Sequence, residues 1–176
     1  SKEEITSGAD FEGMRMRAYS ASTSRMAELL GATPTTVQTP EIPQAFSTGI
    51  IEAMATSPTT GVSSQAWDYT DYYLDARAWI PKNMVFVNAR AFSRLPEEVQ
   101  QAVLEAAAAA ETRGWEMAIA ETDAKTAELA ENGMTVYSPN ADLTETLGNV
   151  GQTMTNEWFE EMGYDSDNPI ADIVGQ

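Results

Sequence analysis

The longest helical pattern in this chain limits what it can fold into. It begins at residues 95–98, where a proline and two glutamates are typical of a first helical turn, and it runs to the stop signal Asn132-Gly133. At a rise of about 1.5 Å per residue, such a helix is about 55 Å long. Because this length exceeds one small lobe, we expect the helix to run between two lobes, with Gly114 as a bend.

Extended and helical patterns alternate in the first third of the chain. The extended patterns cover residues 13–19, 35–38 and 50–56, and the helical patterns cover residues 23–30 and 40–48. This order of strands and helices is typical of a parallel α/β sheet. Ser22 or Thr23 is the expected N-cap of the first helix.

The segment that follows departs from this alternation. Residues 59–61 predict a loop, and the aromatic-rich residues 63–73 predict a helix. Residues 74–87 predict extended structure with a break at Pro81, and residues 84–87 predict a buried strand. Two strands separated by a proline are consistent with a crossing from one lobe to the other.

The sequence after the long helix predicts a strand, a helix and a final turn. We expect a strand at residues 134–137, an amphipathic helix at residues 142–162, and one more turn at residues 168–176.

Composition excludes several classes of function. The chain has 27 acidic and 10 basic residues, a net charge of −17, which disfavours nucleic acid and anionic membranes as partners. It has no cysteine and no histidine, so thiolate zinc sites, cysteine nucleophiles and the commonest general base are absent. Any enzyme with this composition would have to work with carboxylates, lysine, tyrosine or serine. No apolar run approaches the roughly 20 residues that a membrane span needs, and no signal peptide is visible at the start.

Arg17 is the leading candidate for a binding residue. It lies near the end of the first predicted strand, three residues before the hydroxyl-rich residues 20–24 begin. A guanidinium offers a planar fork of donors, and hydroxyls at a helix start add further donors for an anion. Spacing alone also fits an arginine at a sheet edge with no ligand, so both interpretations stay open at this point.

Two acidic groups are weaker candidates. Residues 165–168 resemble the opening of a calcium loop but lack its glycine and distal glutamate, so a solvated turn is the simpler interpretation. Asp68 and Asp71 are three residues apart on a predicted helix, where they fit either paired carboxylates or a solvated helix face.

Four segments in a fixed order carry a resemblance to a known family. They are Gly13-Met14-Arg15-Met16-Arg17, residues 30–35 (LGATPT), residues 41–53 (EIPQAFSTGIIEA) and residues 87–100 (VNARAFSRLPEEVQ). Together with the alanine-rich helix that follows, they resemble the solute-binding proteins of tripartite ATP-independent periplasmic (TRAP) transporters, the DctP family.

The resemblance implies a function and a set of site residues. Such proteins are two-lobed periplasmic receptors that close on organic acids and pass them to TRAP membrane permease subunits. They bind their ligand and do no chemistry on it, so the resemblance implies no catalytic residue, no metal and no cofactor. In the family pattern, the arginine that ends the first segment, here Arg17, binds the ligand carboxylate. Thr56 occupies the position of a ligand-binding amide, Ser57 follows it, and Trp79 and Asn83 lie at the crossing between lobes.

The resemblance also implies a layout. The expected fold is an α/β, periplasmic-binding-protein-like, two-lobed fold that is incomplete, with most of the N-terminal lobe absent. Residues 1–80 belong to the second lobe, residues 81–120 to the first lobe, and residues 121–176 return to the second. We expect such a fragment to self-associate. Two other functions stay open: an α-rich interaction domain that docks through the long helix, and a histidine-independent hydrolase using Asp68, Asp71 or residues 22–24.

Overall fold

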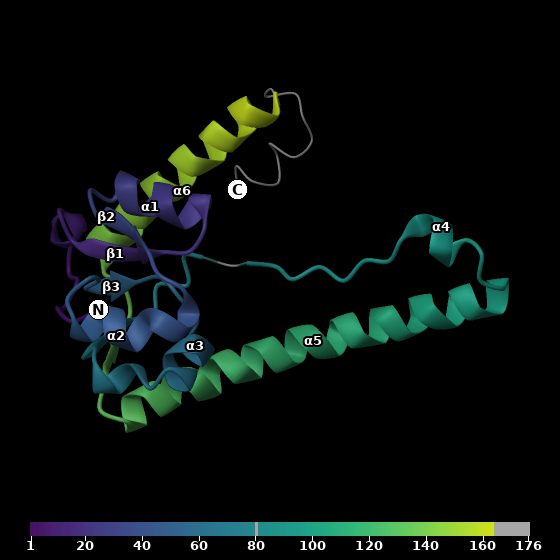
Figure 1. Ribbon diagram of the computed structural model, residues 1–176, viewed down its shortest axis with the longest axis horizontal. Coiled ribbons are helices and arrows are strands. Elements are labelled where there is room, and N and C mark those ends of the chain that lie inside the picture. The colour runs from purple at the N-terminus through teal and green to yellow at the C-terminus, as the bar shows by residue number, and fades with distance from the viewer. Residues whose placement is uncertain (80, 164–176) are drawn as a thin grey trace.

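The chain folds into an α/β body from which two helices extend (Figure 1). The computed structural model describes residues 1–79 and 81–163. Helix α5 (Glu97–Glu131) and the segment before it form a long projection on one side of the body, and helix α6 (Ala141–Met162) leaves the body in another direction.

The body is built on a parallel sheet of three strands. The strands β1 (Arg15–Ala18), β2 (Thr33–Thr36) and β3 (Ala53–Met54) lie in the order β2-β1-β3. Both pairings are parallel, which confirms the predicted α/β sheet. In this register Arg17 of the central strand lies between Thr35 and Met54, at the carboxyl end of the sheet.

The helix α1 (Ala21–Leu29), and η2 (Thr39–Glu41) with α2 (Ile42–Ser47), lie close to the two helices predicted for this unit. The short η1 (Gly8–Phe11) was not predicted. The expected N-cap of α1 was wrong, because Ser20 fills that position. The Ser20 Oγ accepts from the Thr23 backbone N–H at 3.1 Å, and the Thr23 Oγ1 accepts from the Ser20 backbone N–H at 2.9 Å. This reciprocal pair satisfies two free donors and starts the helix earlier than predicted.

Strand β2 also begins earlier than predicted, so that Pro34 lies inside it. Among the described residues β2 pairs with β1 alone, so it is an edge strand there. An edge strand tolerates proline because one side of its backbone has no partner strand.

The segment that follows β3 differs most from the prediction. Residues 59–61 are not a loop but part of helix α3 (Pro58–Ser63), which begins at the N-cap Ser57. Residues 63–73 do not form one helix. Gln65 takes a left-handed backbone conformation, with φ of 52°, and a helix cannot continue through it. A short η3 turn (Ala66–Asp68) follows. Strand β4 (Tyr72–Leu74) then pairs in parallel with β5 (Thr135–Tyr137), the strand predicted after the long helix.

The predicted buried strand at residues 84–87 is wrong. These residues form no strand, and their side chains are exposed, Met84 by 80% and Phe86 by 88%. A strand needs a neighbouring strand for its backbone hydrogen bonds, and no described residue supplies one here. The segment instead runs beside α5, where the Lys82 ammonium lies 5.8 Å from the centre of the Trp115 ring.

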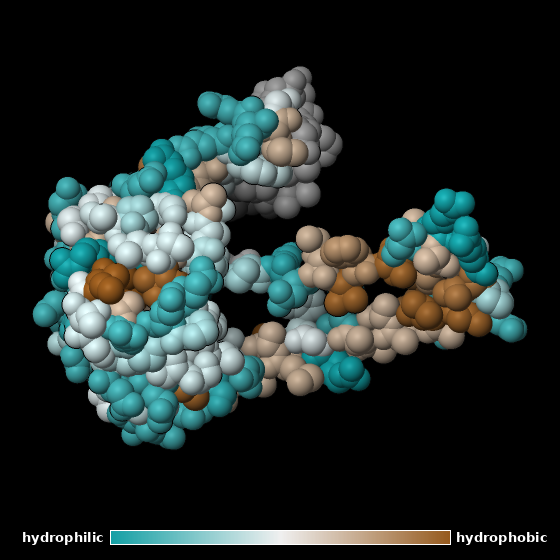
Figure 2. Space-filling model, in the orientation of Figure 1, coloured by the Kyte–Doolittle hydropathy of each residue, from teal (hydrophilic) through white to brown (hydrophobic). Residues whose placement is uncertain are grey.

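Helix α5 has 35 residues and is packed only near its C-terminal end. Leu129 is fully buried there in a cluster with Ala66 and Met134, and Gly114 causes no break in the helix. Residues 81–110, hereafter the arm, include the short helix α4 (Ala89–Phe92) and are almost entirely exposed. Figure 2 shows hydrophobic surface along both parts of the arm, the segment that precedes α5 and the first half of α5 itself.

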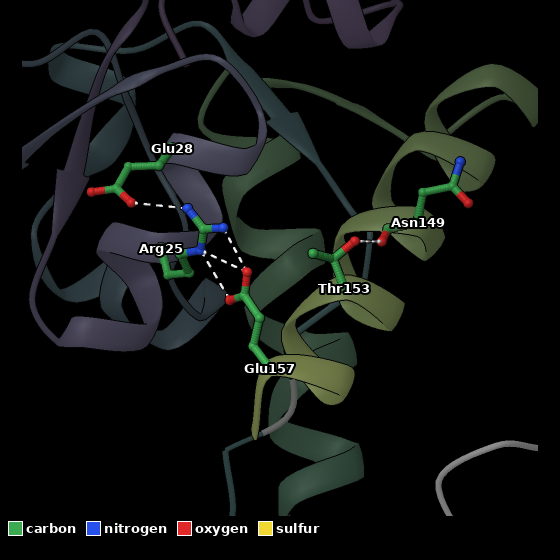
Figure 3. A network of polar contacts seen from close by, with 5 residues as sticks. All are labelled: Arg25, Glu28, Asn149, Thr153 and Glu157. Carbon is green, nitrogen blue, oxygen red and sulfur yellow. Dashed lines mark hydrogen bonds and ion pairs between the residues drawn. The ribbon is translucent and has the colours of Figure 1, made fainter. Parts of the chain in front are cut away.

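Helix α6 packs against the body through its first half. Asn140 caps it, and Leu143 and Val150 are buried in the main core cluster with residues of η1, β1 and α1. Farther along, Arg25 of α1 donates to both oxygens of Glu157, with Nη2 at 2.6 Å from Oε1, and also reaches Glu28 (Figure 3). This ion pair ties the second half of α6 to α1. Among the described residues no helix is both long and apolar enough to cross a membrane.

The Arg25–Glu157 pair predicts a pH-dependent effect on stability. Hydrogen bonding to Arg25 lowers the pKa of Glu157 below its ordinary value of 4.5. The ion pair therefore stabilises the fold fully at pH values above the ordinary pKa of glutamate, and this stabilisation is lost as the pH falls through the lowered pKa of Glu157. Glu157→Gln should reduce the Tm slightly at pH 7, because both side chains are largely solvated, and the difference should vanish in acid.

Thermal unfolding followed by circular dichroism across pH would measure this difference. Glu161→Gln, an exposed glutamate on the same helix, is the control and should behave as wild type. An effect of Glu157→Gln that grows towards low pH would contradict the prediction.

Candidate functional site

A cavity of about 750 Å³ opens at the carboxyl end of the three-stranded sheet. Residues that directly follow the three strands contribute to its wall, because parallel strands end at one edge of a sheet. Its polar wall includes Arg17, Tyr19, Thr39, Thr56 and Ser57. Its apolar wall includes Trp79 and, from the middle of α5, Trp115 and Ile119.

Arg17 is the cationic centre of this cavity. Its side chain is only 4% exposed. The Nε donates to the backbone carbonyl of Val37 at 2.9 Å, and Nη2 donates to the Thr39 Oγ1 at 3.3 Å. The guanidinium carbon lies 5.0 Å from the centre of the Tyr19 ring. Three contacts from two loops therefore hold the guanidinium in one orientation.

The charge of Arg17 has no acidic partner among the described residues. Arg15, Arg25 and Arg77 each face a carboxylate within ion-pair distance. Burial lowers the pKa of Arg17 below its ordinary value, because a charged group is stabilised less away from water. Arginine nevertheless stays protonated at neutral pH. A buried, fixed and uncompensated cation favours an anionic ligand in the cavity.

Of the other residues predicted for the site, three line the cavity and one does not. Thr56 and Ser57 line the cavity directly after β3, although the Ser57 hydroxyl also accepts from the Thr60 backbone N–H at 3.2 Å as the N-cap of α3. Trp79 lines the cavity and packs against the main core cluster. Asn83 is exposed and is not part of the cavity wall.

Sequence reasoning missed Tyr19 and Thr39. Tyr19 belongs to the same segment as Arg17, and its aromatic ring was the available signal. Nothing in the sequence marks Thr39 as a binding residue, because a threonine followed by a proline is common at the start of a helix. The helix residues Trp115 and Ile119 were also missed, because only the packing of α5 brings them to this cavity.

The acidic candidates do not form a site in the described part of the chain. Asp68 lies in η3, and Asp71 lies between η3 and β4, so they do not share a helix face. Residues 165–168 lie outside the described residues. Within residues 1–79 and 81–163, no group of acidic side chains is arranged to hold a metal ion.

A parallel α/β sheet with a buried cation at its carboxyl edge, facing a cavity of this size, is typical of proteins that bind small anionic molecules. The match to known families is more specific. This chain belongs to the DctP family, bacterial extracellular solute-binding protein family 7, whose model matches residues 1–162.

Solved structures agree with this assignment. DctP7 of Bordetella pertussis, an extracytoplasmic solute receptor binding pyroglutamic acid, is 56% identical, with a TM-score of 0.83 over 95% of this chain and 55% of that chain. DctP6 of the same organism, which also binds pyroglutamic acid, is 39% identical, with a TM-score of 0.83 over 91% and 53%.

A third structure is a TRAP solute-binding protein from a marine metagenome, specific for pyroglutamate. It is 28% identical, with a TM-score of 0.79 over 92% of this chain and 53% of that chain. The chain thus has the mixed α/β fold and long helix of the two-lobed TRAP receptors, and it spans about half of their length.

Proposed function

We propose that this chain is part of a periplasmic receptor that binds an organic acid and presents it to the membrane permease of a TRAP transporter. The observation that carries the proposal is Arg17, a buried guanidinium with no acidic partner among the described residues, in the wall of a cavity of about 750 Å³. Such a receptor binds its ligand and catalyses no reaction on it.

Pyroglutamate is the ligand we propose. Three relatives with this fold bind it, and one of them is 56% identical to this chain. Pyroglutamate is a small lactam ring that carries one carboxylate. The carboxylate suits Arg17, the ring suits the apolar wall of Trp79 and Trp115, and the lactam N–H and carbonyl suit the hydroxyls of Thr56 and Ser57.

The proposed layout assigns residues 1–80 and 121–176 to one lobe and residues 81–120 to the other. Two observations support it. The arm is exposed and apolar, as a surface that another part of the receptor covers would be. The middle of α5 also supplies Trp115 and Ile119 to the cavity wall, which suits a ligand held between two lobes.

Isothermal titration of the complete receptor with pyroglutamate tests the proposal. We expect binding of one pyroglutamate per receptor, and no binding of the matching carboxamide, which lacks the negative charge. Equal binding of acid and amide would show that Arg17 does not select a carboxylate. Conversion of the ligand during titration would instead favour an enzyme.

The exposed arm predicts self-association of residues 1–176 on their own. Unpaired backbone and apolar side chains such as Val85 and Phe86 are expected to meet those of a second copy. Light scattering after gel filtration should give a mass well above the 19.1 kDa of one chain. Phe86→Lys should shift the distribution towards monomer, whereas the matched charge change Asn83→Lys should have less effect. A strictly monomeric wild-type profile would contradict the prediction.

A further inference from the structure

We propose that Arg77 holds the arm at the angle seen in this structure, and that the receptor binds its ligand less tightly when this hold is lost. The chain enters the arm through residues 75–79 and leaves it through residues 111–123 of α5, and these two segments are hereafter the neck. The inference rests on the proposed receptor function and gives Arg77 the role of a positioning residue, which acts without contact to the ligand.

The orientation of the arm depends on the neck. Residues 111–123 belong to the part of α5 that extends away from the body, and their side chains are mostly exposed, Trp115 by 48% and Ile119 by 65%. Residues 75–79 form no helix or strand, and of these five residues Trp79 alone packs against a core cluster. Both segments leave the body on the same side (Figure 1). Contacts between them therefore help to decide the angle of the arm.

The backbone turns sharply where the chain enters the neck. The Asp75 N–H still donates to the Tyr137 carbonyl of β5 at 2.8 Å. The Ala76 N–H then donates to the Leu74 carbonyl at 2.9 Å, which closes a tight turn of three residues. Arg77 follows with φ of 48°, in the left-handed region that residues other than glycine rarely adopt. Such a conformation persists where neighbouring contacts hold it.

The Arg77 guanidinium joins the two segments of the neck. Its Nε lies 3.1 Å from Oδ2 and 3.3 Å from Oδ1 of Asp75, in its own segment. Its Nη2 donates to Oδ1 of Asp123, on α5, at 3.5 Å. Among the described residues this is the one ion pair between the two segments. Farther out, the contact of Lys82 with the Trp115 ring joins the start of the arm to α5 again.

A change in the angle of the neck changes the cavity. Arg17 belongs to the wall on the body side, and Trp115 and Ile119 belong to the wall on the neck side. In the present arrangement both sides face one cavity, so a ligand can contact both. The Arg77–Asp123 pair stabilises this arrangement, and a receptor that adopts it less often binds more weakly in proportion. Because both side chains are more than half exposed, we expect an effect of only a few-fold.

Asp123→Asn is the decisive variant, because a charge effect and a neck effect are opposite in sign. The substitution removes a negative charge from the wall of an anion-binding cavity, which by itself would tighten binding. If Arg77 holds the neck through Asp123, isothermal titration of the complete receptor with pyroglutamate should instead give a Kd about threefold higher. Glu116→Gln, an exposed carboxylate of the same segment outside the cavity wall, is the control and should leave the Kd unchanged.

Two further results follow from the same contact. Arg77→Met should also raise the Kd, and the double variant with Asp123→Asn should bind no more weakly than Arg77→Met alone, since both substitutions remove one interaction. In about 1 M salt, the Kd of Asp123→Asn should approach that of wild type, because an exposed ion pair is screened. Additive losses would show that the two residues act separately.

The neck can also be tested without a ligand. Nitroxide labels at Gln44→Cys in α2 and Gln101→Cys in α5, both exposed positions, report the distance from body to arm in the complete receptor by electron–electron resonance. Asp123→Asn and Arg77→Met should broaden the distribution of this distance, and Glu116→Gln should not. Unchanged distances, or unchanged or tighter binding by Asp123→Asn, would overturn the role of Arg77. Failure of the wild-type receptor to bind pyroglutamate would overturn the proposed function instead, and the distances would still decide the role of Arg77.

Discussion

Replacing Arg17 by methionine should abolish measurable pyroglutamate binding to the complete receptor while leaving the fold intact. Removing one member of a buried, charge-assisted pair typically weakens binding by about 100-fold or more. Arg17→Lys should also bind poorly, because an ammonium cannot present two parallel donors to a carboxylate. Isothermal titration measures both losses.

The stability of the same variant separates binding from folding. Since Arg17 is buried without an acidic partner among the described residues, an apolar side chain of similar length should not lower the Tm of the ligand-free protein. Arg15→Met is the matched control, because Arg15 is the exposed first residue of the same strand and pairs with Glu52. It should bind as wild type. Unfolding of Arg17→Met, or wild-type binding by it, would contradict the assignment.

Leu129→Ala should destabilise the chain by about 2–5 kcal/mol, the usual cost of emptying a fully buried leucine site. Leu129 anchors the C-terminal end of α5 among Ala66, Met134 and helix α3, and Gly61 lies directly against it. Little space is left there for neighbours to relax into the cavity. Urea unfolding followed by circular dichroism measures the change in free energy of unfolding.

Leu104→Ala on the same helix is the control. Leu104 is 56% exposed in the arm, so this substitution should change the stability of residues 1–176 by no more than about 0.5 kcal/mol. In the complete receptor the proposed layout predicts a larger effect of Leu104→Ala, because the other lobe would cover it. Equal effects of Leu129→Ala and Leu104→Ala in residues 1–176 would show that α5 is not anchored at its C-terminal end.

The elements predicted well are those whose hydrophobic period is unambiguous. Strand β1 alternates with period two, α6 repeats its apolar residues with helical spacing, and α5 has a proline at its start and a glycine after its end. Local sequence carries this information, because side chains of a strand or helix select their buried face within a few residues.

The elements predicted badly depend on distant residues. The aromatic residues 63–73 have helical spacing, yet β4 (Tyr72–Leu74) begins at their end, because β5 supplies a partner strand from beyond α5. Residues 84–87 have the composition of a buried strand, but no described residue pairs with them. A strand forms only when a neighbouring strand pairs with its backbone, and the sequence of the strand does not say whether such a partner is present.

The same division applies to the site. That the chain has a parallel α/β sheet, and that Arg17 stands at a strand end beside hydroxyl groups, follows from the sequence, because both depend on neighbouring residues. That Arg17 is buried without an acidic partner in the described chain, has one edge held by Val37 and Thr39, and faces a cavity walled by α5 depends on tertiary structure alone. Burial, orientation and charge compensation arise only when loops after different strands and the middle of a long helix meet at one edge of the sheet.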